Sequence, residues 1–206
     1  MKNFAMLLKP LALSITLLAI FAVAQTEARA DQVTFSTAGC FGAGCTPSIT
    51  STAFGSGNAT ATFTNQPTTT VNTSTPSGFT VADLGTISVS GTGTFSSTPF
   101  TLQVNQTLPT AGSGTFTGTL TGTLITNGSD SRIVFNQTSI MIGGIRFDLT
   151  NLAFGNTLFL DPNATGGITR ISAIVSAPVP EPATMILLGT GLAGVAARAR
   201  RRRKVA

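Results

Sequence analysis

Several residue types on which enzymes commonly depend are missing from this sequence or scarce in it. The 206 residues include no histidine, tryptophan or tyrosine, and no lysine lies between Lys9 and Lys204. Without histidine the usual general base is lacking, so neither a Ser-His-Asp nor a Cys-His catalytic arrangement can be built. Without lysine in the central region there is no Schiff-base nucleophile. We therefore expect a protein that is not an enzyme, has no catalytic residues and uses no cofactor.

Acidic residues are also few. Glu27 and Glu181 are the only glutamates and lie in the terminal segments, so an acid-dependent hydrolase would have to rely on the five aspartates. Asp148 alternates with Arg146 along the chain, and we expect these two side chains to interact with each other or with solvent. An aspartate-dependent hydrolase stays open as a third alternative function.

Two acidic turns could supply oxygen ligands of the kind that calcium prefers, at residues 127–130 and 161–163. The same composition is typical of ordinary turns, where Asn and Asp form local hydrogen bonds. No glycine pattern of the Walker or Rossmann type follows a predicted strand and opens a helix. We expect no metal site.

The basic excess of the chain is concentrated at its ends. The formal net charge is +5, yet nine of the twelve lysines and arginines lie outside the region between Asp31 and Pro180. Within that region five aspartates face three arginines, which gives a net charge of −2. The central region lacks a basic surface, and we expect no nucleic-acid partner.

The N-terminal segment has the layout of a secretory signal peptide. Lys2 and Lys9 provide a positive start, residues 11–24 are apolar, and Ala28 and Ala30 form a small-x-small cleavage site. We expect residues 1–30 to engage the secretion translocon and to be removed by signal peptidase after Ala30. A permanent N-terminal anchor is the alternative.

The C-terminal segment, residues 178–206, has three parts in a fixed order. A rigid break comes first, because each proline fixes its own φ and restricts the residue before it. Residues 183–197 follow without a charge and are predicted to form a transmembrane helix about 22 Å long, which is short for a hydrocarbon core of roughly 30 Å. A basic end, residues 198–204, should stay cytoplasmic by the positive-inside rule. A buried core helix and a nucleic-acid patch are the competing interpretations of these two parts.

These residues resemble the PEP-CTERM sorting signal of exported proteins in Gram-negative bacteria that make extracellular polysaccharide. The resemblance implies that an exosortase, a membrane-embedded cysteine protease, recognises the tail and cuts near the Pro-Glu-Pro triplet. The protein would then be released or transferred to the cell surface. The predicted processing motif is Val179, Pro180, Glu181 and Pro182, and the predicted basic stop is Arg198, Arg200, Arg201, Arg202, Arg203 and Lys204.

Cys40 and Cys45 are the only cysteines and are separated by four residues, two of them glycines. In an exported protein such a pair is most simply a disulfide that closes a small loop. A metal or redox site is the alternative, but zinc would need further ligands from carboxylates because histidine is absent. We expect a disulfide whose main effect is local rigidity near the mature N-terminus.

The central region, residues 31–177, is rich in Thr, Ser, Gly and Asn, and its apolar residues recur with a period of two, which indicates strands. In Thr115–Leu124 the apolar and glycine positions share one face and five threonines share the other. Thr86–Phe95 repeats the pattern, with glycines 91 and 93 marking a bulge or bend. Further strands are expected within residues 59–64, 100–104, 132–135, 145–149, 158–160 and 168–175, whereas long loops are expected between residues 41 and 77.

We therefore predict one all-β domain of eight to ten short strands, an antiparallel β-sandwich or jelly roll, between a signal peptide and a C-terminal transmembrane helix. A β-solenoid is the alternative fold, although no fixed repeat period supports it. The predicted function is that of a structural protein of the cell surface or extracellular matrix, associated with exopolysaccharide or biofilm. The membrane would hold it only before processing. The alternative is a displayed binding module for glycan, calcium or ice, which would use the threonine faces or the acidic turns.

Overall fold

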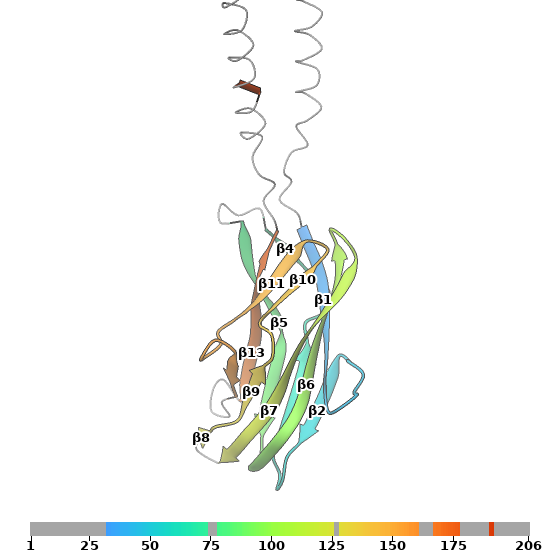
Figure 1. The fold of residues 1–206 in the computed structure, drawn as a ribbon. Coiled ribbons are helices and arrows are strands. Elements are labelled where there is room, and N and C mark those ends of the chain that lie inside the picture. Colours follow the sequence, from blue (N-terminus) through green and yellow to red (C-terminus); the bar gives the residue numbers. More distant parts are fainter. Residues whose placement is uncertain (1–31, 74–77, 126–127, 161–166, 178–189, 192–206) are drawn as a thin grey trace, which may run out of the picture.

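The structure is a computed structural model that describes residues 32–73, 78–125, 128–160, 167–177 and 190–191. The predicted signal peptide, its cleavage site, most of the predicted transmembrane helix and the basic end lie outside these residues, so those parts of the sequence analysis stay predictions. Among the described residues from Gln32 to Ala177, every regular element is a β-strand (Figure 1).

One sheet consists of seven strands in the described residues, and six of them follow the order β12-β9-β7-β6-β1-β4, while β8 pairs with β7. The strands are β1 (Gln32–Phe41), β4 (Thr69–Asn72), β6 (Gly93–Leu108), β7 (Gly112–Ile125), β8 (Gly128–Ser129), β9 (Arg132–Phe135) and β12 (Thr157–Phe159). We call this the first sheet.

The second sheet has six strands in the described residues, in the order β10-β11-β13-β5-β3-β2. The strands are β2 (Thr50–Phe54), β3 (Thr60–Asn65), β5 (Phe79–Ser90), β10 (Ser139–Ile142), β11 (Ile145–Thr150) and β13 (Ile168–Ser176). Each strand pairing in both sheets is antiparallel. The prediction of an antiparallel all-β fold is confirmed, and the solenoid alternative does not fit, because solenoid coils stack in parallel.

The two sheets pack against each other around one core. Phe35 on β1 contacts Phe147 on β11 edge to face, with ring centroids 5.6 Å apart. Phe63 on β3 contacts Phe100 on β6 at 5.8 Å. Each of these ring pairs joins one sheet to the other, and all four rings are buried. Aromatic pairs of this kind add stability beyond the area that they bury.

Strand β7 matches its predicted pattern closely. Phe116, Leu120 and Leu124 are completely buried, while the threonines between them face away from the core. The reason is the two-residue period of a strand, which sends alternate side chains to opposite faces. The arrangement confirms the predicted strand at Thr115–Leu124, and the structure extends it to Gly112–Ile125.

The predicted strand at Thr86–Phe95 is only partly correct, because the chain leaves the second sheet at Ser90 and enters the first at Gly93. Gly91 has φ +78° and Gly93 has φ +147°, which residues with a side chain rarely adopt. Both glycines pack tightly against residues 56–59. The predicted bend is therefore present, but it is a change of sheet rather than a bulge within one strand.

The expectation of long loops between residues 41 and 77 is wrong where β2 and β4 lie, whereas the strand predicted at residues 59–64 is present as β3. Strands β2 and β4 are the outermost strands of their sheets. An outermost strand has a neighbour on one side only and buries little apolar surface. Threonine, which favours the extended backbone, and serine are therefore enough to form the strand, and the alternation of apolar residues is weak. The expected eight to ten short strands are also an underestimate, because thirteen are described and β5, β6 and β7 are 12, 16 and 14 residues long.

A buried hydroxyl joins the two sheets. Thr37 on β1 is 2% exposed, and its Oγ1 donates to the Leu84 carbonyl oxygen of β5 at 2.7 Å. The same Oγ1 accepts a hydrogen bond from the Gln66 backbone N–H at 2.8 Å. The donor and an acceptor site of this hydroxyl are thus used, which offsets the cost of burying it.

Strand β1 begins and β13 ends at the same end of the body (Figure 1). We call this end the proximal pole, because the chain continues from Ala177 into the C-terminal tail. The opposite end, where β5 ends at Ser90 and β6 begins at Gly93, is the distal pole. Ala177 itself packs against the core, so the tail leaves directly from the folded body.

Candidate functional site

The predicted sorting motif, residues 179–182, and the predicted basic stop, residues 198–204, lie outside the described residues. Within the predicted span only Thr190 and Gly191 are described, and both are helical. Among the residues that the structure describes, no helix has the length and apolar character needed to cross a membrane. The described structure therefore bears on sorting through two features of the folded body: the point from which the tail leaves, and the surface around that point.

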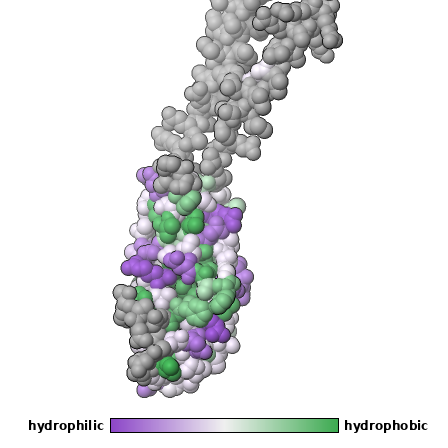
Figure 2. Space-filling model, turned by 90° about the vertical axis from the view of Figure 1, so that its left-hand side faces the viewer, coloured by the Kyte–Doolittle hydropathy of each residue, from purple (hydrophilic) through white to green (hydrophobic). Residues whose placement is uncertain are grey.

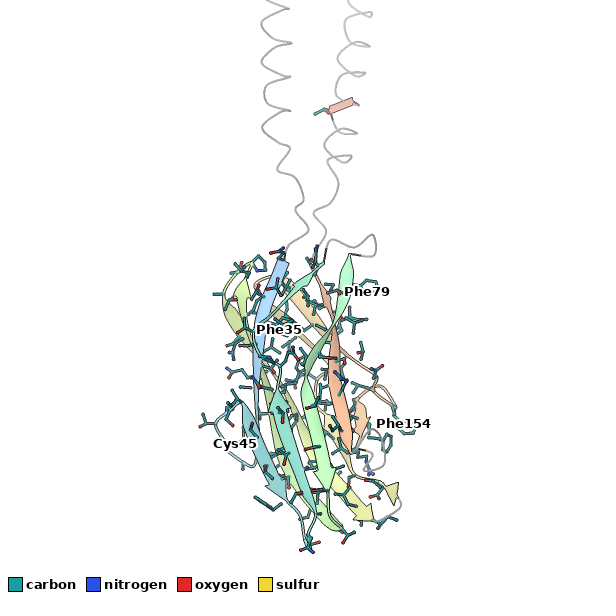
Figure 3. The ribbon with its side chains drawn as sticks, turned by 180° about the vertical axis from the view of Figure 1, so that it is seen from behind. Phe35, Cys45, Phe79 and Phe154 are labelled. Carbon is teal, nitrogen blue, oxygen red and sulfur yellow. A yellow bond between two sulfur atoms is a disulfide. The ribbon has the colours of Figure 1, made fainter. Side chains whose placement is uncertain are left out.

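The proximal pole carries an apolar surface near that point. Val81 on β5 is 59% exposed and pairs with Ile174 on β13, which is half-buried. Phe79, two residues before Val81 and labelled in Figure 3, is 41% exposed. We call Phe79, Val81 and Ile174 the proximal patch. Figure 2 shows an apolar area at this end of the molecule, above a band of hydrophilic residues.

The predicted disulfide is present between Cys40 and Cys45, whose Cα atoms are 5.9 Å apart. Cys40 is the ninth residue of β1, so the bridge lies far along that strand from Gln32 rather than near the mature N-terminus in space. In the chain-entropy model, closing a loop this short destabilises the unfolded state by about 2 kcal/mol, because the unfolded chain loses conformational freedom. The bridge therefore holds the turn between β1 and β2 in place.

The three aspartates that the structure describes each have hydrogen-bond partners. Asp83 accepts from Arg170 Nη1 at 2.8 Å and from Ser172 Oγ at 2.9 Å. Asp130 accepts from the Thr123 backbone N–H.

The third aspartate, Asp148, accepts from Arg146 Nε at 2.9 Å. This contact confirms the predicted interaction of these two residues. The ion pairs formed by Arg146 and Arg170 are both substantially exposed, so each contributes no more than about 1 kcal/mol.

The two acidic turns that could bind calcium are described only in part. Of the two, residues 161–163 lie outside the described part, and in the other turn Asp130 bonds to the neighbouring strand. The described ranges contain no group of three His, Cys, Asp or Glu side chains that could hold a metal ion.

Threonine and serine hydroxyls on neighbouring strands bond to each other. The Oγ atoms are 2.8 Å apart for Thr34 and Thr70, and 2.6 Å apart for Thr60 and Ser90. Thr52 and Thr62 form a similar pair at 3.1 Å, as do Thr94 and Thr123 at 3.2 Å. Cross-strand pairs of this type stabilise a sheet by a few tenths of a kcal/mol up to about 1 kcal/mol each. The threonine ladders therefore act in part within the sheets themselves.

A cavity of about 440 Å³ lies between β12 and the start of β13, and it was not predicted from the sequence. Its lining combines apolar and polar side chains: Asn151, Ala153, Thr157, Leu158, Phe159, Ile168, Thr169 and Arg170. The volume and the mixed lining fall in the range of small-molecule sites. Figure 2 shows a second apolar area on this side of the molecule, below the hydrophilic band.

Phe154 stands beside this cavity with 90% of its surface exposed, and its ring contacts Phe159 at 6.3 Å. Its φ is +52°, and that of Asn151 is +59°. A positive φ is uncommon for a bulky residue and costs of order 1–3 kcal/mol. The signal in the sequence was a phenylalanine placed directly before Gly155 and Asn156, in a segment with the composition of a turn.

Comparison with known families gives one result, at the tail. Residues 178–202 match the PEP-CTERM protein-sorting motif. No curated protein and no solved structure matches the chain. The match confirms the resemblance and indicates export, sorting at the membrane to the cell surface, and an exosortase as processing partner.

Proposed function

We propose that this protein is a structural component of the cell surface or extracellular matrix, associated with exopolysaccharide or biofilm. Its tail holds it in the inner membrane through residues 183–197 until an exosortase cuts near Pro180-Glu181-Pro182. The β-body then reaches the surface or the medium. It has no enzymatic activity.

The observation that carries this proposal is the PEP-CTERM motif at residues 178–202, which begins one residue after Ala177. Since Ala177 packs on the core, the motif is joined to the folded body without a long linker. The composition of the body agrees with a structural role. Its described carboxylates bond to neighbouring groups, and its threonine pairs reinforce the sheets. A neutral surface rich in hydroxyl groups is also compatible with a hydrated polysaccharide.

The test is the intact mass of the protein recovered from the surface and medium of its host, with mapping of both terminal peptides. We expect a product that begins at Asp31 and ends near Pro180, because signal peptidase and the exosortase would each remove one segment. A mature product that still carries Arg200 to Lys204 would overturn the exosortase step and indicate a permanent anchor.

A triple substitution supplies the matched control: Pro180→Ala, Glu181→Ala and Pro182→Ala. It leaves residues 183–204 intact, so membrane retention should persist while cleavage is lost. A variant that is processed like the natural protein would show that the triplet does not direct the cut.

A displayed ligand-binding module is the second candidate, and the cavity beside Phe154 favours it. An aromatic side chain held in a strained conformation and exposed to solvent is typical of functional loops. If the cavity holds a segment of the host exopolysaccharide, Phe154→Ser should weaken co-sedimentation with the purified polymer by roughly ten-fold or more, comparable to losing one aromatic contact of about 1.5 kcal/mol. Phe54→Ser, at another exposed phenylalanine, is the control. Equal binding by both variants would contradict the binding function, and the structural role would then be the remaining proposal.

A further inference from the structure

The proximal pole carries further exposed apolar side chains outside the proximal patch. Leu108, at the end of β6, is 49% exposed, and Met141 on β10 is 69% exposed. Four strands, β5, β6, β10 and β13, thus place apolar groups at one end of the body. Single exposed apolar residues are normal on a protein surface, so it is their common position that requires an explanation.

Strand register places two of these side chains beside the strand that leads to the tail. Val81 lies opposite Ile174 on β13. Met141 lies opposite Arg146, and Arg146 lies opposite Ser176, the last residue of β13. Neighbouring strands are about 4.8 Å apart, so Met141 is roughly 10 Å from the strand from which the tail leaves. Val81 and Met141 therefore flank the exit of the tail on its two sides.

The charges near this exit do not oppose an approach to lipid. Asp148 is the one carboxylate on the adjoining part of β11, and Arg146 neutralises it at 2.9 Å. The guanidinium group of Arg146 remains 55% exposed and offers hydrogen-bond donors of the type that bind phosphate.

The length of chain between body and tail limits how far this pole can stand from the membrane. Only residues 178–182 separate Ala177 from the predicted span. Fully extended, that segment reaches about 20 Å. The span itself is shorter than the hydrocarbon core, and short spans are accommodated by local thinning or by drawing flanking residues toward the interface. The proximal pole consequently cannot stand more than about 20 Å from the end of the predicted span, close to the lipid head groups.

We propose that, before cleavage, the proximal pole lies on the membrane surface, with Val81, Ile174, Leu108 and Met141 in contact with lipid and Arg146 facing lipid phosphates. The proposal rests on the anchoring of the tail described under the proposed function. Its consequence is that Pro180-Glu181-Pro182 stays at the membrane interface, where a membrane-embedded protease can reach it.

The experiment exploits the absence of tryptophan and tyrosine from the chain, which makes any introduced tryptophan the only strong fluorophore. Val81→Trp and Met141→Trp probe the proximal pole. Phe54→Trp is the control, because residue 54 is 77% exposed and pairs through Thr60 with Ser90, nine residues or about 30 Å along β5 from Val81. Each variant, as the uncleaved chain from Asp31 to Ala206, is reconstituted in phosphatidylethanolamine and phosphatidylglycerol vesicles with brominated acyl chains.

We expect Val81→Trp and Met141→Trp to show blue-shifted emission and roughly two-fold quenching, because interfacial groups lie about 5–10 Å into the boundary between head groups and acyl chains. Phe54→Trp should emit as it does in solution. Equal emission from all three variants in protein that floats with the vesicles would overturn the docking of this pole and leave the anchored tail intact. Protein that does not float with the vesicles would overturn both the anchor and the docking.

Discussion

Replacing Phe100 with alanine should lower the free energy of unfolding by about 3–5 kcal/mol, as expected for a buried aromatic ring. Phe100 is 1% exposed and contacts three other rings. The centroid distances are 4.8 Å to Phe41, 5.8 Å to Phe63 and 6.3 Å to Phe135. Because Phe63 belongs to the other sheet, the substitution leaves a cavity at the contact between the two sheets.

Urea denaturation measures this effect, with Phe54→Ala as the control. Phe54 is 77% exposed, so its truncation should change stability by no more than about 0.5 kcal/mol. Since domains are stable by only about 5–15 kcal/mol, the Phe100 variant should lose a large part of its stability. A loss similar to that of the control would contradict the position of this ring in the core.

Gly91→Ala is the second substitution with a large expected effect, roughly 3–5 kcal/mol when the strained backbone and the steric overlap are added. A Cβ atom at this position would overlap the Asn58 carbonyl oxygen, and the φ of Gly91 is +78°. The overlap involves backbone, so a side-chain rotation cannot relieve it. The turn at residues 56–59 or the step between sheets would have to move.

Gly155→Ala separates the two contributions. Gly155 has a similar φ of +84°, yet a Cβ atom there would have no neighbour within 4 Å. The stability lost in Gly155→Ala should therefore reflect only the strained backbone conformation, about 1–2 kcal/mol. Thermal or urea unfolding of both variants measures the difference. Equal losses would mean that the turn at residues 56–59 adapts to the methyl group without cost.

Most inner strands were predicted because burial on one face imposes a period of two, although the inner strand β1 was not among them. Phe116, Leu120 and Leu124 are all buried, and the predicted strand at residues 132–135 coincides with β9. Strands β2 and β4 were not predicted, since an outer strand with little to bury shows little apolar alternation. The order in which the strands pair could not be predicted from the sequence either, because neighbouring strands such as β1 and β6 are about seventy residues apart in the chain.

The candidate functional features also fall into two groups, those that were predicted from the sequence and those that were not. The disulfide and the contact between Arg146 and Asp148 followed from short spacings, which constrain geometry directly. The cavity beside Phe154 did not, because it forms between β12 and β13, and only the fold brings residue 151 near residue 170. The proximal pole was missed for the same reason, as Val81, Leu108 and Met141 come from separate parts of the sequence.

The attachment of the tail to β13 also determines how the body responds to mechanical force. Strand β13 is an inner strand, paired with β5 from Ile168 to Ser176 and with β11 along its last residues. A pull on Ala177 from the proximal pole runs nearly parallel to this strand, so it shears the flanking hydrogen bonds together instead of opening them one at a time. As long as the tail stays anchored, drag on the distal pole is borne by the whole length of the strand.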